Sequence, residues 1–223
     1  VFGDWSSDVC SSDLTAPSAA SIGMQPDMYE SLCSVSAAWD CPISLKGNLR
    51  ELRAHPRTAD NLEVMRRWEE ARLARFFSPE QIEAFRRGDR EHILLVDEKG
   101  GFELQPCEQF EGIAGASQAI RAFLFDRSGK THMVFWHPSG KANLEIDIDP
   151  GRIRLFRELG REIGVTKTTG GVTIPYGDRQ YLRVDLSKQE TRSLLRGARV
   201  TAWVKLNDAH LPGACRTNYA GGG

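Results

Sequence analysis

The sequence predicts an α+β fold, in which a helical N-terminal segment precedes an antiparallel β-sandwich. Two observations predict it. Up to about residue 88, apolar side chains recur at helical spacing, most clearly in "TADNLEVMRRWEEARLARFF". From residue 91 onward the period changes, and roughly eight or nine short apolar segments follow one another at about ten-residue spacing, separated by Gly-containing turns. Such spacing is typical of a sandwich of short antiparallel strands.

The first elements of the helical segment are a helix and a short strand. "DMYESLCSVSAAW" (27–39) places its apolar residues near one helical face, with Asp27 as the expected N-cap and Glu30 at the capping-box position. "CPISL" (41–45) reads as a short buried strand that begins behind a proline. A turn and a short helix follow this strand.

Residues 58–77 form the strongest single element, an amphipathic helix with a broad apolar stripe and many oppositely charged pairs at helical spacing. A second helix is expected over 78–88, with Ser78 as its cap and Gly88 as its end. A stripe as wide as that of residues 58–77 requires a large packing partner.

The second half reads as successive hairpins. "EKGG" is a hairpin turn, "NLEIDI" alternates apolar and charged side chains, and Gly170-Gly171 lies between two strands. A capped helix is expected over 187–197, and the tail from 198 has no consistent period. The expected domains are therefore the end of a helical unit at 15–90, a sandwich at 91–186, and a short helix with an irregular tail at 187–223.

Composition narrows the class of protein. The chain has 223 residues, a formal charge of −1, and 40% hydrophobic and 26% charged residues, which is ordinary for a globular protein. The near-neutral charge gives no reason to expect nucleic acid, and no apolar run is long enough for a membrane helix. Its five cysteines form no CxxC pair and no zinc spacing, which favours idle thiols.

No catalytic motif of a known type is present: there is no GxSxG, P-loop or HExxH sequence, and no cofactor or metal is expected. Several residues with reactive or binding side chains have simpler structural interpretations. We expect Trp136 to cover the sandwich core and His137 to start a turn, and we expect Trp39 to pack at a helix end. Glu69 and Glu70 are expected to form surface ion pairs. Asp147 and Asp149 are expected to lie on a solvated face.

Residues 1–14 stand apart from the rest. "DWSSDVCSSDL" has neither strand nor helix period, and it lacks the basic start and apolar stretch of a signal peptide. A solvated Ser/Asp-rich linker is one interpretation. The string also closely resembles the translated sequencing-adapter read-through found at the start of truncated metagenomic genes. That resemblance implies a disordered segment foreign to the fold, and a protein that continues upstream.

The remaining layout resembles the end of a glycoside hydrolase (β/α)8 barrel joined to its C-terminal β-sandwich. The stretch "MVFWHPSGKANLEIDIDPGRIRLFRELGREIGVTKTTGGVTIPYGDRQYLRVD" carries most of this resemblance, with a strand ending in Trp136 and with Pro175 and Tyr181 in the family's usual places. "DMYESLCSVSAAWDCPISLKG" resembles the seventh barrel helix and eighth strand, and residues 58–77 resemble the eighth helix.

The resemblance implies that the whole protein is a carbohydrate-active glycosidase whose two catalytic carboxylates lie at the ends of earlier strands, typically the fourth and seventh, which precede residue 27 and are expected to lie outside this chain. This part alone would then be inactive and would support the barrel. At most Ser44 and Lys46 at the end of the eighth strand, and Asn48 in the following loop, would face the carbohydrate substrate.

The alternative is a non-catalytic carbohydrate- or protein-binding β-sandwich module. Such a module needs two exposed aromatic side chains close together, and the expected ones are Trp136, Tyr176 and Tyr181. The barrel interpretation makes its own prediction, because a helical remnant would leave its stripe uncovered. Large exposed side chains are then expected among Met28, Leu32, Leu62, Met65 and Trp68.

Overall fold

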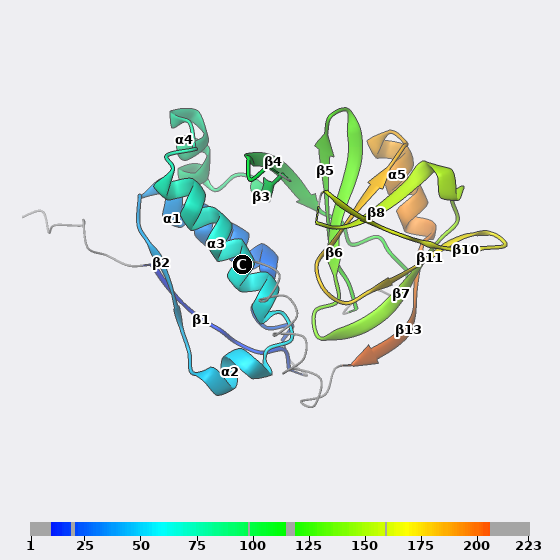
Figure 1. Ribbon diagram of the computed structural model, residues 1–223, viewed down its shortest axis with the longest axis horizontal. Helices are drawn as coiled ribbons and strands as arrows, with labels where there is room; N and C mark the ends of the chain where they lie inside the picture. Colours follow the sequence, from blue (N-terminus) through cyan, green and yellow to red (C-terminus); the bar gives the residue numbers. More distant parts are fainter. Residues whose placement is uncertain (1–9, 19–20, 98, 115–118, 159, 206–223) are drawn as a thin grey trace, which may run out of the picture. The chain divides into compact units, whose positions relative to one another are not determined.

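The computed structural model describes residues 10–18, 21–97, 99–114, 119–158 and 160–205, and these form an α+β fold that contains a β-sandwich (Figure 1). The chain divides into two compact units. The N-terminal unit holds the described residues up to Leu95 together with Phe102–Leu104. The C-terminal unit holds Val96–Gly101 and the described residues from Gln105 onward.

The N-terminal unit is mainly helical. Its elements in chain order are β1 (Cys10–Asp13), α1 (Pro26–Ala38), β2 (Ile43–Lys46), α2 (Leu49–Ala54), α3 (Thr58–Leu73), α4 (Pro79–Arg87), most of β3 (Glu91–Val96) and the start of β4 (Phe102–Gln109). β1 and β2 pair in parallel, with Cys10 opposite Ile43 and Asp13 opposite Lys46. Because α1 connects two parallel strands, β1, α1 and β2 form one β-α-β unit.

Residues 10–14 are therefore part of the fold, and the expectation of disorder was wrong for them. Leu14 is buried in the core of the helical unit, directly after β1. A parallel pair needs only backbone groups, so the Ser- and Asp-rich composition does not prevent pairing. Residues 1–9 lie outside the described part of the chain.

Helix boundaries follow local capping chemistry. Ser78 caps α4 through a capping box with Gln81, and Gly88 ends it in the left-handed conformation (φ 62°), as predicted. The expected Asp27 cap of α1 was wrong, because the N-cap is Gln25 and makes no side-chain bond. Pro26 starts the helix one residue earlier with its fixed φ, which leaves Asp27 in the first turn, where a negative charge is favoured.

The apolar stripe of α3 is covered within the N-terminal unit. Trp68 is 1% exposed and contacts Phe77 (ring centroids 5.1 Å apart) and Phe85 (5.4 Å). α3 ends at Leu73, earlier than expected, and Arg75 in the left-handed region (φ 53°) turns the chain so that the amide of Phe76 donates to the carbonyl of Ala71. This turn brings the phenylalanines back over the stripe.

The prediction of large exposed side chains on α1 and α3 was consequently wrong. None of the five residues named for it is exposed: Met65 and Trp68 are buried, and the others, partly buried, are Met28, Leu32 and Leu62. α1 and α3 pack on each other, and α4 packs on α1. The exposed large apolar residues of this unit are different ones, namely Val35, Trp39, Leu49 and Leu73.

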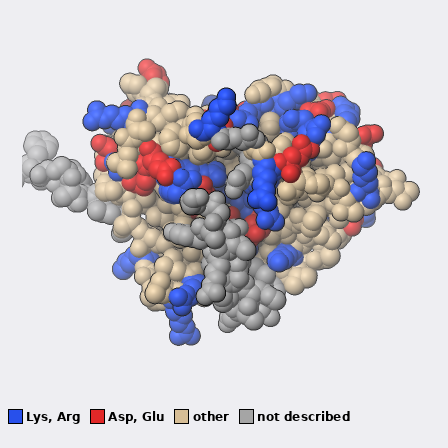
Figure 2. All heavy atoms as spheres, viewed as in Figure 1, with Lys and Arg blue, Asp and Glu red and all other residues tan. Residues whose placement is uncertain are grey.

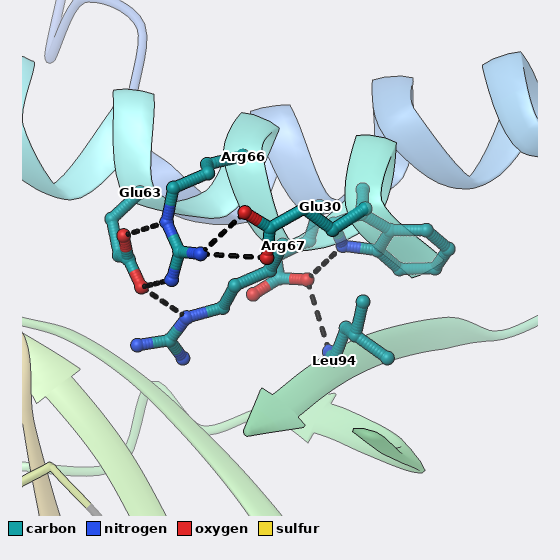
Figure 3. Close-up of polar contacts among 7 residues, drawn as sticks. Glu30, Glu63, Arg66, Arg67 and Leu94 are labelled. Carbon is teal, nitrogen blue, oxygen red and sulfur yellow. Dashed lines mark hydrogen bonds and ion pairs between the residues drawn. The ribbon is translucent and has the colours of Figure 1, made fainter. Parts of the chain in front are cut away.

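A buried carboxylate joins three elements of this unit (Figure 3). Glu30 of α1 is 5% exposed, and its Oε2 accepts hydrogen bonds from the indole Nε1–H of Trp68 (2.5 Å) on α3 and from the backbone N–H of Leu94 (3.1 Å) on β3. On the outer side of α3, Glu63, Arg66, Arg67 and Glu70 form an ion-pair network at helical spacing.

The C-terminal unit is the sandwich. The remaining elements are β5 (Arg121–Arg127), β6 (Lys130–Trp136), β7 (Gly140–Ile146), a 3₁₀ turn (Pro150–Arg152), β8 (Ile153–Glu158), β9 (Arg161–Ile163), β10 (Thr166–Thr168), β11 (Gly171–Tyr176), β12 (Gln180–Val184), α5 (Lys188–Gly197) and β13 (Arg199–Lys205). One sheet has the order β3-β4-β5-β6-β12-β8-β9, and the other has the order β10-β11-β7-β13.

The two sheets of the sandwich share one apolar core. β7 contributes Leu144 and Ile146, and the predicted alternation of "NLEIDI" is confirmed because both side chains are buried. The facing strands contribute buried side chains such as Met133, Phe135 and Leu182. α5 begins as predicted, with a capping box between Ser187 and Glu190.

The tail contains a strand that sequence periodicity did not reveal. β13 pairs antiparallel with β7, so the expectation of an irregular segment from residue 198 was wrong for 199–205. Its register shifts between Thr201 and Val204, and this bulge disrupts the two-residue alternation from which strands are recognised. Residues 206–223 lie outside the described part of the chain.

The two adjacent glycines at the β10–β11 turn have different surroundings. A Cβ at Gly171 would lie 2.1 Å from the backbone oxygen of Ile146 and 2.8 Å from the Cα of Asp147. A Cβ at Gly170 would meet nothing within 4 Å. The turn itself is confirmed, but only Gly171 is required by close packing of backbone against backbone.

We expect Gly171→Ala to lower the free energy of unfolding of the sandwich by about 2 kcal/mol or more, because β11 must move away from β7. Gly170→Ala is the matched control and should lie within about 0.5 kcal/mol of the original. Urea unfolding followed by far-UV circular dichroism measures both. Equal effects of the two substitutions would show that the close approach at Gly171 relaxes at no cost.

We expect Glu30→Ala to destabilise the helical unit by about 3 kcal/mol, because the Trp68 indole and the Leu94 amide lose their shared acceptor in a buried site. Glu30→Gln retains a side-chain oxygen that accepts both bonds, so it should lose clearly less. The same unfolding measurement checks this. If the alanine and glutamine variants are equally destabilised, the acceptor oxygen is not what stabilises the site.

Candidate functional site

The parallel pairing of β1 and β2 gives the N-terminal unit one edge at which both strands end. Asp13 lies opposite Lys46 at that edge, and the amide of Leu14 donates to the carbonyl of Lys46 (3.4 Å). The loop that follows β1 and the segment that follows β2 therefore start from the same place. In β-α-β folds, the carboxyl ends of parallel strands are where ligands bind.

Two of the three predicted substrate-facing residues lie together on one face of β2. Ser44 and Lys46 are exposed, while the alternate residues Ile43 and Leu45 pack against the core of the helical unit. The two-residue period of a strand accounts for this arrangement. β2 thus presents a hydroxyl and an ammonium group on its free face.

Asn48, the third predicted residue, has a different role from Ser44 and Lys46. Its Oδ1 accepts from the backbone N–H of Glu51 (3.0 Å), and the Glu51 carboxylate accepts from the backbone N–H of Asn48 (3.2 Å). This capping box starts α2. The side-chain oxygen of Asn48 is therefore occupied by the fold, and what the residue offers to a ligand is its Nδ2 group.

The loop after β1 is closed on itself. The amide of Met24 donates to the carbonyl of Thr15 (2.8 Å), and Gly23 adopts a left-handed conformation (φ 68°). A Cβ at Gly23 would lie 2.4 Å from the oxygen of Thr15, so no other residue fits there without displacing the backbone. From α3, the Nδ2 of Asn61 donates to the carbonyl of Met24 (3.2 Å) and holds the end of the loop.

A buried polar cluster lies between α2 and α3, beside this loop. His55 and Arg57 are both buried, and the Nδ1 of His55 accepts from the backbone N–H of Arg57 (3.0 Å). The Arg57 guanidinium forms an ion pair with Asp60 (3.4 Å), and the hydroxyl of Thr58 donates to the carbonyl of Leu52 (2.6 Å). Sequence reasoning missed this cluster, although "HPRTAD" places a histidine and an arginine beside a proline before a helix.

Burial lowers the pKa of His55 to about 4, the positive charge of Arg57 acts in the same direction, and the backbone carbonyls of Met24 and Thr15 oppose them. The imidazole is therefore neutral at pH 7. Since its Nδ1 accepts a hydrogen bond, the ring proton is on Nε2. The imidazole therefore occupies this buried site without a charge.

We expect this histidine to make stability depend on pH. Between about pH 6.5 and pH 4, the unfolded chain binds a proton that the folded chain does not, so the free energy of unfolding falls as the pH falls, by on the order of 3 kcal/mol. His55→Gln removes this contribution and should flatten the curve. Urea unfolding at pH 7.5, 6 and 5 measures the difference between the two proteins. A difference that is constant with pH would contradict the assignment.

The other side chains considered from sequence have structural surroundings. Trp136 is buried and stacks on Phe123 (5.7 Å), but the expectation that it covers the sandwich core was wrong, because Met133 and Phe135 line that core and Trp136 lies on the other face of β6. The Nδ1 of His137 accepts from the turn amide of Ser139, as predicted. Glu69 and Glu70 pair with arginines on α3, also as predicted, and Glu69 in addition accepts from the amide of Ile43.

Trp39 also differs from its prediction. The interpretation of helix-end packing was wrong, because its side chain is 64% exposed. The guanidinium of Arg86 lies 5.1 Å from the ring centroid and covers one of its faces. Asp40 next to it adopts a left-handed conformation (φ 51°), and this turn directs the chain from α1 into β2 and leaves the indole outside the core.

The aromatic side chains expected to distinguish a binding module are all in the interior. Trp136, Tyr176 and Tyr181 are buried, so they form no exposed pair. The exposed aromatic residue of the sandwich is instead Trp203 on β13, at 52% exposure. It lies in the strand that sequence periodicity did not reveal.

Asp147 is exposed, as predicted, and Asp149 caps the 3₁₀ turn by accepting from the amide of Gly151 (2.7 Å). Within the described ranges, no group of three or more His, Cys, Asp or Glu side chains is arranged to hold a metal ion. The described thiols of Cys33, Cys41 and Cys107 are free of disulfides. No helix in the described part of the chain is long and apolar enough to cross a membrane.

Charges of both signs are interspersed on the surface: over the helices on the left of Figure 2, acidic and basic side chains lie next to one another. Burial alone would raise the pKa of Glu63, but its hydrogen bond to Arg66 and the charge of Arg67 outweigh burial and hold that pKa below its usual range. This network is an ion-paired helix face of the kind that stabilises a long helix.

Comparisons with known proteins leave the family open. No protein-family model, no curated protein and no solved structure matches the chain.

Proposed function

We propose that the chain is the C-terminal part of a carbohydrate-active (β/α)8-barrel glycoside hydrolase, in which the β-sandwich supports the barrel. The observation that carries the proposal is the β1–α1–β2 unit, whose two strands are parallel and joined by a helix. This unit is followed by the long helix α3 and then by an antiparallel sandwich. The same order of elements is expected where the last strands and helices of such a barrel meet an accessory sandwich.

The physical argument concerns the faces and edges of the β1–β2 pair. Parallel sheets are found with both faces covered and with more strands than two. Here one face of β2 packs on the helical core, while Ser44 and Lys46 are exposed on the other. Among the described residues, neither strand has a second neighbour. Further strands on both edges would close a barrel, and the exposed face would become its interior.

This arrangement gives the predicted site residues a role. The carboxyl ends of barrel strands carry the active site, and Ser44, Lys46 and Asn48 lie along or just after β2. Lys46 would donate hydrogen bonds to sugar hydroxyl groups, and so would the Nδ2 group of Asn48. At least one of the two carboxylates that cleave the glycosidic bond, the one on the fourth strand, would come from upstream of this chain, so the present chain alone would bind weakly and would not hydrolyse.

The test uses the protein extended upstream, with the reading frame recovered from the source DNA. We expect the extended protein to hydrolyse aryl glycosides. Lys46→Ala should raise KM roughly tenfold with kcat changed much less, because the lost contact is made to the bound substrate in its ground state as well. Lys99→Ala, at an exposed turn residue of the other unit, is the matched control and should leave both constants unchanged.

Two outcomes would overturn the proposal. One is an upstream frame that encodes no further β-α units with acidic residues at strand ends. The other is an extended protein that is folded and hydrolyses none of a panel of aryl hexosides and pentosides. If the extended protein is active and Lys46→Ala has unchanged kinetics, only the proposed contact between Lys46 and the substrate is refuted.

The second candidate, a non-catalytic binding module, loses the aromatic pair on which it was based, because Trp136, Tyr176 and Tyr181 are buried. The glycoside hydrolase is therefore the function that the geometry supports best.

A further inference from the structure

The edge strand β13 carries a strained bulge. Its register with β7 shifts between Thr201 and Val204, so Ala202 and Trp203 have no partner residues on β7. Ala202 adopts a left-handed conformation (φ 48°), which is costly for a residue other than glycine. Bulges of this kind redirect side chains and are frequent beside binding sites. The result here is an indole that is 52% exposed in the middle of a strand.

The exposed indole of Trp203 packs against a series of rings, His137, Tyr176 and Phe135, which we call the ring ladder. Trp203 stacks on the imidazole of His137, with centroids 5.8 Å apart and planes at 27°. His137 in turn lies 6.0 Å from Tyr176, and the ring of Tyr176 contacts Phe135 in the sandwich core.

The lower rings of the ladder are fixed by hydrogen bonds. The hydroxyl of Tyr176 donates to the carbonyl of Ala119 (2.6 Å), and the backbone N–H of His137 donates to the carbonyl of Gly177 (2.9 Å). His137 and Tyr176 are both buried. One face of the Trp203 ring is therefore held in a fixed orientation, and its exposed area lies on the side away from the core.

We propose that the Trp203 indole is a stacking platform for a pyranose ring of a polysaccharide. A sugar ring has apolar C–H faces and a rim of hydroxyl groups, so it requires a flat apolar surface bordered by hydrogen-bonding groups. Trp203 provides the surface, and the backbone groups at the bulge, where the register with β7 shifts, provide polar groups at the strand edge. The class of ligand rests on the proposed function, whereas the location of the platform does not.

A nucleobase is the other flat ring that a tryptophan can stack, and it is less favoured here. Single-stranded nucleic acid also needs a positively charged groove along its backbone. On β13, Arg199 is paired with Glu145 (3.3 Å), so its charge is compensated. The formal charge of the whole chain is −1. Both features favour a neutral ligand.

The experiment is affinity electrophoresis of the 223-residue chain in native gels that contain arabinoxylan, barley β-glucan, galactomannan, amylopectin or hydroxyethylcellulose. We expect at least one polysaccharide to retard the chain, and Trp203→Ala to weaken that binding by roughly tenfold or more. Trp203→Phe should retain part of the affinity. Trp39→Ala is the matched control, since it removes an exposed indole from the other unit and should change nothing.

Retardation by none of the five polysaccharides would overturn the inference, and so would equal retardation of the original chain and Trp203→Ala. Retardation by a single-stranded oligonucleotide in place of the polysaccharides would assign the platform to a nucleobase and overturn it as well. Circular dichroism of each variant shows whether the sandwich is folded. If Trp203→Ala is unfolded, the retardation of Trp203→Phe relative to the original chain decides whether the indole binds the polysaccharide. Failure here leaves the aryl glycoside assay of the extended protein unaffected, so the two proposals fail separately.

Discussion

The carboxylate of Glu30 is the constraint around which the helical unit is arranged. A buried carboxylate is stable only where donors meet it, and these donors come from α3 and from β3, far from α1 in the sequence. The same Trp68 indole that donates to Glu30 also contacts Phe77 and Phe85. The position of α4 and the left-handed turn at Arg75 then follow from the need to complete this ring cluster.

The same unit combines a rigid interior with an unfinished sheet. Its helices cover one another, and its polar cluster holds the loop after β1 with a neutral His55 and an amide from Asn61. Its two parallel strands nevertheless expose a polar face at Ser44 and Lys46. The unit thus has a covered apolar stripe on α3 and an exposed polar face on β2.

Much of the fold could be predicted from local signals. Ser78, Gly88 and Ser187 mark helix ends through capping chemistry that depends only on nearby residues, and the alternation in "NLEIDI" correctly identified a strand. The features that sequence patterns did not reveal, β13 and the polar cluster at His55, depend on long-range geometry. The bulge at Ala202 broke the alternation that reveals strands, and the buried His55 needed the fold to bring its loop and Arg57 together. Ser44 and Lys46 could be placed on one face, whereas the capping box of Asn48 with Glu51 is a local signal that the barrel interpretation overlooked.

The strand β4 has a consequence for folding cooperativity. Phe102–Leu104 belong to the helical unit and the following residues of the strand belong to the sandwich, so one strand is divided between the two units. β3, which a division at residue 90 would have assigned to the sandwich, also lies mostly with the helices. Loss of β4 would remove Phe102 and Leu104 from the helical core and a pairing partner of β5 from the sandwich sheet, which ties the unfolding of one unit to that of the other. A cut in the turn between β3 and β4 would leave both strands whole but would separate Phe102–Leu104 from the helical unit to which they belong.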